Sequence, residues 1–389
     1  MLKIIHICQY YNDGYGYQEN LLPKYQKKLG HDVKVITSNR TSFFSSGQRP
    51  KIVGVGEYED NGFTVHRLSI LGEFKGKFVF FKGLRELLEE EKPDYIFHHG
   101  ITSPSIITCA KYKAKNSSVF LVADNHAEYC NSARIPILSH LYYRFLWTPL
   151  IKRVSHHVDV FFSITPGCKA FAEKELSIPE NKHKILYLGS DTEVNKYNET
   201  EGKKVRDLFG IQQDEIVAIT AGKFDEKKRL DSLIKAFRKI DSQQTRLIIV
   251  GSFLQEEYEK YIDGCIGKDD RIIKVGWVQA NELFKYFSAS DFAVFPGGQS
   301  AVWQQTISCE LPLVIKYWPG TEYLLSRDNG LFLFSDKQEE IEQALKVMVN
   351  SPKTRGEMRE NAKIVRNEML SYEVIAKQSV SFIDEKDKG

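Results

Sequence analysis

Residues 216–240 read IVAITAGKFDEKKRLDSLIKAFRKI. The first five residues are apolar or β-branched and predict a buried strand, whereas Leu230 to Ile240 place apolar residues at helical spacing. Gly222 and a run of cations lie between these two segments. A buried strand, a short loop and an amphipathic helix in this order are typical of the repeating unit of a parallel α/β sheet.

The same alternation extends along the chain in both directions. It predicts strands at 4–8, 33–36, 95–97, 119–122 and 158–164 before this stretch, and at 247–250, 272–275 and 292–295 after it. The pattern restarts after about residue 195, and the polar stretch 193–204 has the composition of a linker. The sequence therefore predicts an α/β protein with two doubly wound Rossmann-like domains, residues 1–192 and 193–370, facing across a cleft. We expect a C-terminal helix at about 371–386 to pack back on the first domain.

Length and composition agree with two soluble domains. The chain has 389 residues, more than one hydrophobic core usually serves, and 42% of them are hydrophobic. The formal net charge of +3 gives no reason to expect a nucleic-acid partner. No run of about eighteen apolar residues is present, and the start of the chain does not resemble a signal peptide. Six scattered cysteines fit free thiols in a reducing cytoplasm better than a zinc cage or a disulfide framework.

Two loops at strand ends carry residues that suit phosphate binding. Gly14 and Gly16 follow the first strand, where glycines let backbone N–H groups approach an anion, although an ordinary βα turn has the same composition. Lys223 and Lys228 follow the strand at 216–220, and their ammonium groups suit a diphosphate. The alternative for this second loop is a solvated run of charge.

Two further segments follow predicted strands. His126 comes after the strand that we expect to end at Val122, and its imidazole suits contact with an acceptor hydroxyl, although a structural histidine is the commoner case. After the strand at 292–295, Ser300 is placed to cap a helix, and the free amides of Ser300 and Ala301 suit a phosphate. The alternative here is a capped helix without a ligand.

In this order the motifs resemble those of the family 4 glycosyltransferases, which have the GT-B fold, and the resemblance covers nearly the whole chain. The segments that carry it are Gly14 with Gly16, Gly30-His31-Asp32-Val33, Ser163 to Lys169, Leu188-Gly189-Ser190-Asp191, Gly222-Lys223 to Lys228-Arg229, Asp231 to Phe237, Val250-Gly251, Val275 to Val278, Ser290 to Pro296, Gly320 to Tyr323 and Asp328 to Leu331.

The chain departs from the family pattern at the donor site. The family usually carries two glutamates eight positions apart, the second of them seven residues before a Leu-Pro. Counting back from that motif places the pair at Gly297 and Gln305, and a shift in loop length would put Gln299 in place of the first. Lys223 also stands where arginine is usual, so the charge is kept but the bidentate fork is lost.

The resemblance implies a retaining, metal-independent glycosyltransferase that uses a nucleotide-diphosphate sugar, with UDP slightly favoured over GDP, and a saccharide or lipid-linked acceptor. The first domain would hold the acceptor and the second the donor. We expect His126, Lys223 and Lys228 to be catalytic, and no residue to bind a metal. The expected donor-binding residues are Gly14, Gly16, Gly222, Lys223, Lys228, Gly251, Val278, Gln299, Ser300, Ala301 and Gln305. Two alternatives stay open: a GT-B sugar-nucleotide epimerase, and a non-catalytic sugar-nucleotide-binding subunit.

The segment from Ser139 to Arg153 combines aromatic, aliphatic and cationic residues. Such a helix can lie in the headgroup region of a membrane, and relatives of this kind often act on lipid-linked acceptors. The alternative is an internal helix of the acceptor domain, and Pro149 is expected to interrupt any continuous amphipathic face. We therefore expect a cytoplasmic protein, with peripheral contact at the inner face of the membrane as the open question.

Overall fold

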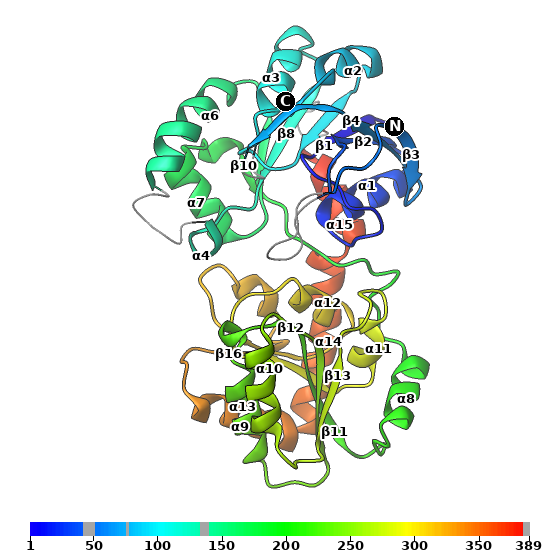
Figure 1. Cartoon of the computed structure of the whole chain (residues 1–389), viewed down its shortest axis with the longest axis vertical. Coiled ribbons are helices and arrows are strands. Elements are labelled where there is room, and N and C mark those ends of the chain that lie inside the picture. The colour runs from blue at the N-terminus through cyan, green and yellow to red at the C-terminus, as the bar shows by residue number, and fades with distance from the viewer. Residues whose placement is uncertain (42–50, 75–77, 133–139, 384–389) are drawn as a thin grey trace. The chain divides into compact units, whose positions relative to one another are not determined.

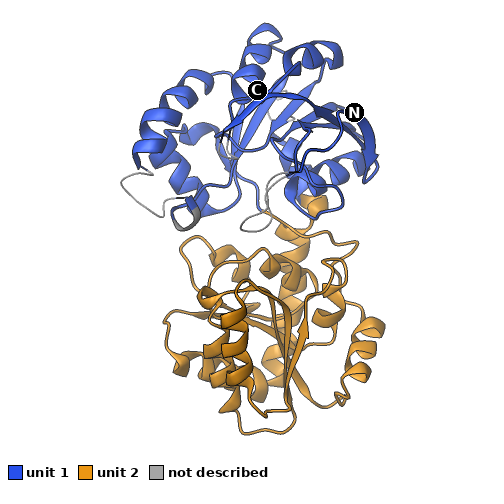
Figure 2. Ribbon diagram, viewed as in Figure 1, with its two compact units in different colours: residues 1–187, 375–389 blue, residues 188–374 orange. Residues whose placement is uncertain are grey.

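The computed structural model describes residues 1–41, 51–74, 78–132 and 140–383. The chain forms two compact units (Figure 2), one of residues 1–187 with 375–389 and one of residues 188–374. Each unit is an α/β body with its own sheet (Figure 1). The fold class expected from the sequence is therefore confirmed.

Unit 1 contains an eight-stranded sheet in the order β10-β9-β8-β7-β1-β2-β4-β3. All neighbours are parallel except β3 and β4. A separate antiparallel pair, β5 (Ile70–Phe74) and β6 (Phe78–Phe81), lies outside this sheet. The strands of the main sheet are β1 (Lys3–Ile7), β2 (Asp32–Ser38), β3 (Gly56–Asp60), β4 (Phe63–Leu68), β7 (Tyr95–His98), β8 (Phe120–Asn125), β9 (Val160–Ser163) and β10 (His183–Ile185).

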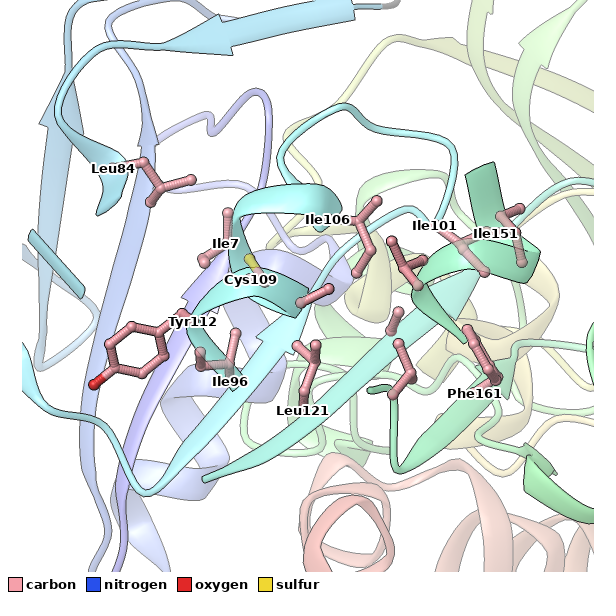
Figure 3. Packing of buried hydrophobic residues seen from close by; sticks show 14 of the residues in the cluster. Ile7, Leu84, Ile96, Ile101, Ile106, Cys109, Tyr112, Leu121, Ile151 and Phe161 are labelled. Carbon is pink, nitrogen blue, oxygen red and sulfur yellow. The ribbon is translucent and has the colours of Figure 1, made fainter. Parts of the chain in front are cut away.

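Helices cover both faces of this sheet because its strands alternate their side chains between the two faces. Ile7, Ile96 and Leu121 belong to a core cluster under the helices of one face (Figure 3). On the other face, the Tyr95 hydroxyl donates to the Ser379 carbonyl, so the C-terminal helix packs on unit 1. The helices of unit 1 are α1 (Gln18–Lys28), α2 (Leu84–Glu91), α3 (Ile106–Lys115), α4 (Tyr129–Ser132), the π-helix η1 (Tyr142–Trp147), α6 (Thr148–Val154), α7 (Pro166–Leu176), the 3-10 turn η2 (Glu180–Lys182) and α15 (Tyr372–Val380), of which the first residues belong to unit 2.

Unit 2 contains a six-stranded parallel sheet in the order β13-β12-β11-β14-β15-β16. Its strands are β11 (Ile216–Phe224), β12 (Thr245–Phe253), β13 (Ile272–Gly276), β14 (Phe292–Phe295), β15 (Leu313–Lys316) and β16 (Gly330–Leu333). Its helices and turns are α8 (Glu199–Leu208), η3 (Glu226–Lys228), α9 (Leu230–Arg238), α10 (Glu256–Ile266), α11 (Leu283–Ser288), α12 (Val302–Ser308), η4 (Glu322–Leu325), α13 (Gln338–Asn350), α14 (Pro352–Val365) and η5 (Arg366–Leu370). The order of β11, β14 and β12 brings the loops after these strands to one edge of the sheet.

Every strand that the sequence predicts is present, and two of the extensions beyond the predicted ends change where site residues lie. The strand predicted at 216–220 continues to Phe224, because it pairs with β12 along its whole length. The strand predicted to end at Val122 continues to Asn125, because Asp124 and Asn125 pair with β9. Residues placed in loops by the sequence analysis therefore lie in strands.

Candidate functional site

The carboxyl ends of β11 and β12 form the centre of the candidate site in unit 2. Gly222 lies opposite Gly251 in the register of these strands, and both have positive φ, 141° and 147°. A Cβ on Gly251 would lie only 1.8 Å from the carbonyl oxygen of Gly222. The two glycines therefore let the central strands approach closely and keep side chains out of this part of the edge.

The two lysines of the predicted donor loop occupy different environments. Lys223 lies one residue before the end of β11, and its side chain is exposed. Lys228 ends η3, and its Nζ donates hydrogen bonds to the carbonyl oxygens of Gly298 at 2.8 Å and Gln299 at 2.7 Å. Burial lowers the pKa of Lys228, and Asp225 partly opposes this shift. Because an ammonium group has three N–H donors, one donor of Lys228 remains for an oxygen atom of a ligand.

The loop after β14 packs on η3 through a glycine. A Cβ on Gly297 would lie 2.2 Å from the Lys227 carbonyl oxygen and 2.6 Å from the Lys228 Cα. The same carbonyl accepts a hydrogen bond from Gly298 N at 2.9 Å. Position 297 therefore has no room for the glutamate of the family pattern, and the half-buried Gln299 is left as the polar side chain nearest to that position in sequence.

The helix after this loop begins later than the sequence predicts. α12 starts at Val302, with Ala301 before it in helical conformation, and Ser300 Oγ accepts only a long hydrogen bond of 3.4 Å from Val302 N. Ser300 therefore caps only the turn that leads into α12, where its carbonyl also accepts a bond from Trp303 N. Gln305 is half-buried within α12.

A neighbouring glutamine in α12 was missed by the sequence analysis. Gln304 is buried, its Nε2 donates to the Tyr323 hydroxyl at 3.3 Å, and its Oε1 has no hydrogen-bond partner. Val278 is half-buried in the loop after β13, next to the exposed Trp277. α12 begins, and the loop after β13 lies, at the sheet edge where β11 ends, because these strands are parallel.

In unit 1, side chains from the adjacent β3–β4 pair fix the loop that carries Gly14 and Gly16. Arg67 of β4 donates to both carboxylate oxygens of Asp13 at 3.1 Å, and Tyr58 of β3 donates to the same carboxylate. Gly14 has a φ of 72°, whereas a Cβ there would meet no atom within 4 Å. Glycine is thus needed at this position for the backbone conformation and not for space.

His126 directly follows β8, and its ring is oriented by a buried carboxylate. Its Nε2 lies 3.2 Å from Oδ2 of Asp124, which is fully buried, while 42% of the His126 side chain is exposed. Burial by itself lowers the pKa of His126, but the charge of Asp124 and the hydrogen bond to it outweigh burial, so the net shift is upward.

Two further ionisable residues beside His126 were not predicted. His99 follows β7, and its Nδ1 lies 3.3 Å from the same Asp124 oxygen. Glu19 lies in the first turn of α1; burial raises its pKa, and the charges of His99 and His126 oppose this shift. The sequence did contain a signal for both residues, because Glu19 follows the glycine-rich loop and His99 follows a predicted strand.

A cavity of about 490 Å³ lies in unit 2, away from the donor loop. It includes Asp291, which precedes β14, and therefore lies at the opposite edge of the sheet from the donor loop. Two of its basic side chains are already engaged, since Arg206 pairs with Asp291 and Arg359 donates to the Ser290 carbonyl. We do not assign this cavity to the candidate site.

The segment predicted to contact either a membrane or the core is partly buried and partly exposed. Ser139 lies outside the described residues; within η1 and α6, Trp147 and Ile151 are buried, whereas Phe145 and Leu146 are exposed by 70% and 52%. Pro149 occupies the first turn of α6 and does not interrupt a helix, which corrects the expectation from sequence, because a first-turn proline loses no helical hydrogen bond.

Two features are absent from the described residues. No helix within those ranges is long and apolar enough to cross a membrane. Across the same part of the chain, no three His, Cys, Asp or Glu side chains are grouped so that they could hold a metal ion.

Comparison with known proteins gives relatives for both halves of the chain. A family model described as Glycosyltransferase Family 4 matches residues 21–194, and one described as Glycosyl transferases group 1 matches residues 203–365. An uncharacterised glycosyltransferase of Methanocaldococcus jannaschii is 24% identical over 55% of this chain and 57% of its own length. The alpha-monoglucosyldiacylglycerol synthase of Acholeplasma laidlawii is 25% identical over 50% of each chain. The alignments thus span about half the length of these curated relatives.

Solved structures resemble the fold over nearly the whole chain. The crystal structure of Anabaena HepE in complex with UDP has a TM-score of 0.72, with 15% identity over 98% of this chain and 100% of that one. The two family models, matched in sequence order, together span most of the residues that form the two sheets. The chain therefore belongs to the family 4 glycosyltransferases and has their GT-B fold of two Rossmann-like domains.

Proposed function

We propose that the protein transfers a sugar, with retention of configuration, from a nucleotide-diphosphate sugar to a saccharide or lipid-linked saccharide acceptor. In this proposal unit 2 binds the donor and unit 1 the acceptor. The transferred group is a hexosyl or N-acetylhexosaminyl residue. A role in the synthesis of surface polysaccharide or glycoconjugate follows from such an acceptor.

The placement of Lys228 carries this proposal. Its ammonium group is held by two carbonyl oxygens of the loop after β14, at the edge of the sheet where glycines clear the space. A preorganised cation with one remaining donor is suited to the negative charge that develops on a leaving diphosphate. Lys223 adds a second, exposed cation at the end of β11. These two charges would take the part that a divalent metal has in other transferases, so the proposed reaction needs no metal.

Other residues of the edge suit the rest of the donor. Gln299 and Gln305 are half-buried and can form hydrogen bonds with sugar or ribose hydroxyls, although neither can carry the charge of a glutamate. The backbone amides of Ser300 and Ala301, Val278, and the glycines Gly222 and Gly251 would complete the donor contacts. UDP is the nucleotide that we favour, since HepE is similar in fold and its crystals contain UDP or UDP-glucose.

On the acceptor side, His126 and an aromatic pair are the proposed contacts. Tyr15 and Tyr17 stack on each other with ring centroids 5.7 Å apart, and both are partly exposed in the loop that carries Gly14 and Gly16. Exposed aromatic faces suit the apolar face of a saccharide ring. His126 would orient an acceptor hydroxyl or the transferred sugar.

We also propose a peripheral contact with the cytoplasmic face of the membrane through η1 and α6. Phe145 and Leu146 are exposed there beside Arg144, and Lys152 and Arg153 are exposed on α6. Aromatic and aliphatic groups with neighbouring cations fit the headgroup region of an anionic bilayer.

A thermal-shift screen of UDP- and GDP-sugars tests the donor proposal directly. A ligand at a hundred times its dissociation constant stabilises the native state by about 2.7 kcal/mol. For a unit of this size, that corresponds to a rise in melting temperature on the order of 5–10 °C. Absence of any shift with every sugar nucleotide tested would contradict the proposal.

A further inference from the structure

A continuous chain of hydrogen bonds connects the C-terminal helix of unit 1 to the Asp124 carboxylate. It begins at Ser379 in α15, whose hydroxyl donates its only proton to the Ala376 carbonyl at 2.7 Å. The Ser379 oxygen must therefore act as acceptor for Gln26 Nε2, which lies 2.8 Å away. This contact fixes the orientation of the Gln26 amide, so that its carbonyl oxygen points at His6.

The Gln26 orientation in turn fixes the tautomer of His6. Gln26 Oε1 lies 2.6 Å from His6 Nε2, and a carbonyl oxygen can only accept, so His6 Nε2 carries a proton. His6 is fully buried, and burial, together with the charge of His99, lowers its pKa well below the usual value. The His6 ring is therefore neutral, and its Nδ1 has only a lone pair to offer.

His99 lies between two groups that both require a proton from it. Its Nε2 is 2.9 Å from the bare Nδ1 of His6, and its Nδ1 is 3.3 Å from Oδ2 of Asp124. Asp124 is fully buried and its other oxygen accepts a hydrogen bond from Gly100 N at 2.6 Å. Although burial alone raises the pKa of Asp124, its contacts with His126 and His99 hold that pKa well below the usual range, so the carboxylate is ionised and can only accept.

We propose that His99 is a buried imidazolium ion, held in an ion pair with Asp124, and that this pair is the positioning device for His126. A neutral His99 would leave one ring nitrogen facing an acceptor with lone pair against lone pair. The doubly protonated ring satisfies both neighbours and balances the charge of Asp124, which is itself fully buried. Asp124 can then stay ionised and hold His126 Nε2 at the edge of the sheet.

The other ionisable groups near Asp124 do not provide the positive charge that compensates its carboxylate. His98, on β7, points to Ser105 with its Nε2 at 2.8 Å, and burial lowers its pKa to about 3, so it is neutral. Glu19, on α1, has a pKa raised by burial and adds no further cation. Among the described residues around Asp124, the cations are thus His99 and, when protonated, His126. The step from His126 to turnover rests on the proposed function, whereas the charge of His99 does not.

The full chain, with histidines labelled in ¹⁵N and ¹³C and without any ligand, tests the charge directly. His99 is assigned through His99→Gln, and the ring ¹⁵N shifts report which nitrogens are protonated. We expect both nitrogens of His99 to be protonated at neutral pH and His6 to carry its proton on Nε2 alone. A singly protonated His99 at neutral pH would overturn the proposal whether or not the protein transfers sugars.

Asp124→Asn tests the positioning role. Removing an adjacent opposite charge should return His99 to the neutral ring and lower the pKa of His126 by about one unit or more, followed through its ring ¹³C shift. Asp159→Asn is the matched control, since this half-buried carboxylate accepts from Leu121 N in the same sheet and pairs with Lys113, and it should change neither signal. An unchanged pKa of His126 in Asp124→Asn would overturn the positioning role.

The pH profile of turnover separates positioning from mere loss of structure. In Asp124→Asn, the limb of the pH–turnover profile that reflects titration of His126 should move to lower pH by the same amount as the pKa of His126. A uniform fall at every pH, with the limb unmoved, would also overturn the positioning role. If Asp124→Asn does not fold, the wild-type measurement of His99 still decides the proposal.

Discussion

Lys228→Met removes the charge that the proposed mechanism depends on and keeps most of the apolar stem. In the native structure the Lys228 ammonium forms two hydrogen bonds, to the Gly298 and Gln299 carbonyls. A hydrogen bond to a charged group contributes about 1.5–3 kcal/mol, and the lower end applies to a partly exposed side chain. For the two bonds together we therefore expect a loss of stability on the order of 3 kcal/mol. A domain with about 5–15 kcal/mol of stability remains folded after such a loss.

Turnover should fall much further than the folded fraction. Removal of a preorganised group that stabilises developing charge costs about 10²–10³-fold in kcat, or about 2.7–4 kcal/mol. The assay follows nucleoside diphosphate release from the sugar nucleotide that gives the largest thermal shift, with urea unfolding of the same samples. Lys227→Met is the matched control, because Lys227 is an exposed neighbour in the same turn and should keep nearly full turnover. A folded Lys228→Met protein within about threefold of wild-type turnover would refute the leaving-group role.

Three further outcomes are expected. EDTA should leave turnover unchanged, and activity lost on chelation and restored by Mn²⁺ or Mg²⁺ would contradict metal independence. Burial lowers the pKa of His98 to about 3, so the stability that His98 contributes is complete above about pH 6.5 and is lost at about 1.4 kcal/mol per pH unit as the pH falls towards 3. His98→Gln, which keeps a partner for Ser105, should flatten this part of the curve of unfolding free energy against pH, measured by urea titration. An unchanged slope would refute the assignment of this pH dependence to His98. Co-sedimentation with anionic vesicles should weaken with salt and in Arg144→Ser with Phe145→Ser, and a wild-type protein that stays in the supernatant at low salt would contradict membrane contact.

The parallel sheets could be predicted from sequence because their buried strands are short apolar runs. Ile4 to Ile7 and Phe292 to Phe295 are of this kind, and both were found. The edge strand Gly56–Asp60 was not predicted, since the sequence GEYED is polar and becomes a strand only through antiparallel pairing with β4. Such pairing depends on tertiary contacts and not on local propensity.

The loops of the site were predicted, but the contacts of their side chains were not. Lys228 binds carbonyl groups seventy and seventy-one positions further along the chain, which no local pattern encodes. His6 and Asp124 share a face of the sheet only because β1, β7 and β8 are neighbours in a particular register. The missing first glutamate could be seen by counting, whereas its physical reason, the close contact of Gly297 with the Lys227 carbonyl, required the structure.

The most direct test of sugar transfer measures two products in one reaction. The protein is incubated with UDP-glucose carrying a labelled sugar, with and without lipid-linked and soluble saccharide acceptors, and UDP release and glycoside formation are measured together. The account predicts acceptor-dependent UDP release, an equal amount of labelled glycoside with the anomeric configuration of the donor, and loss of both in Lys228→Met. Binding of UDP-glucose, seen as a rise in melting temperature, with no glycoside formed from any acceptor would contradict it and favour a sugar-nucleotide-binding subunit.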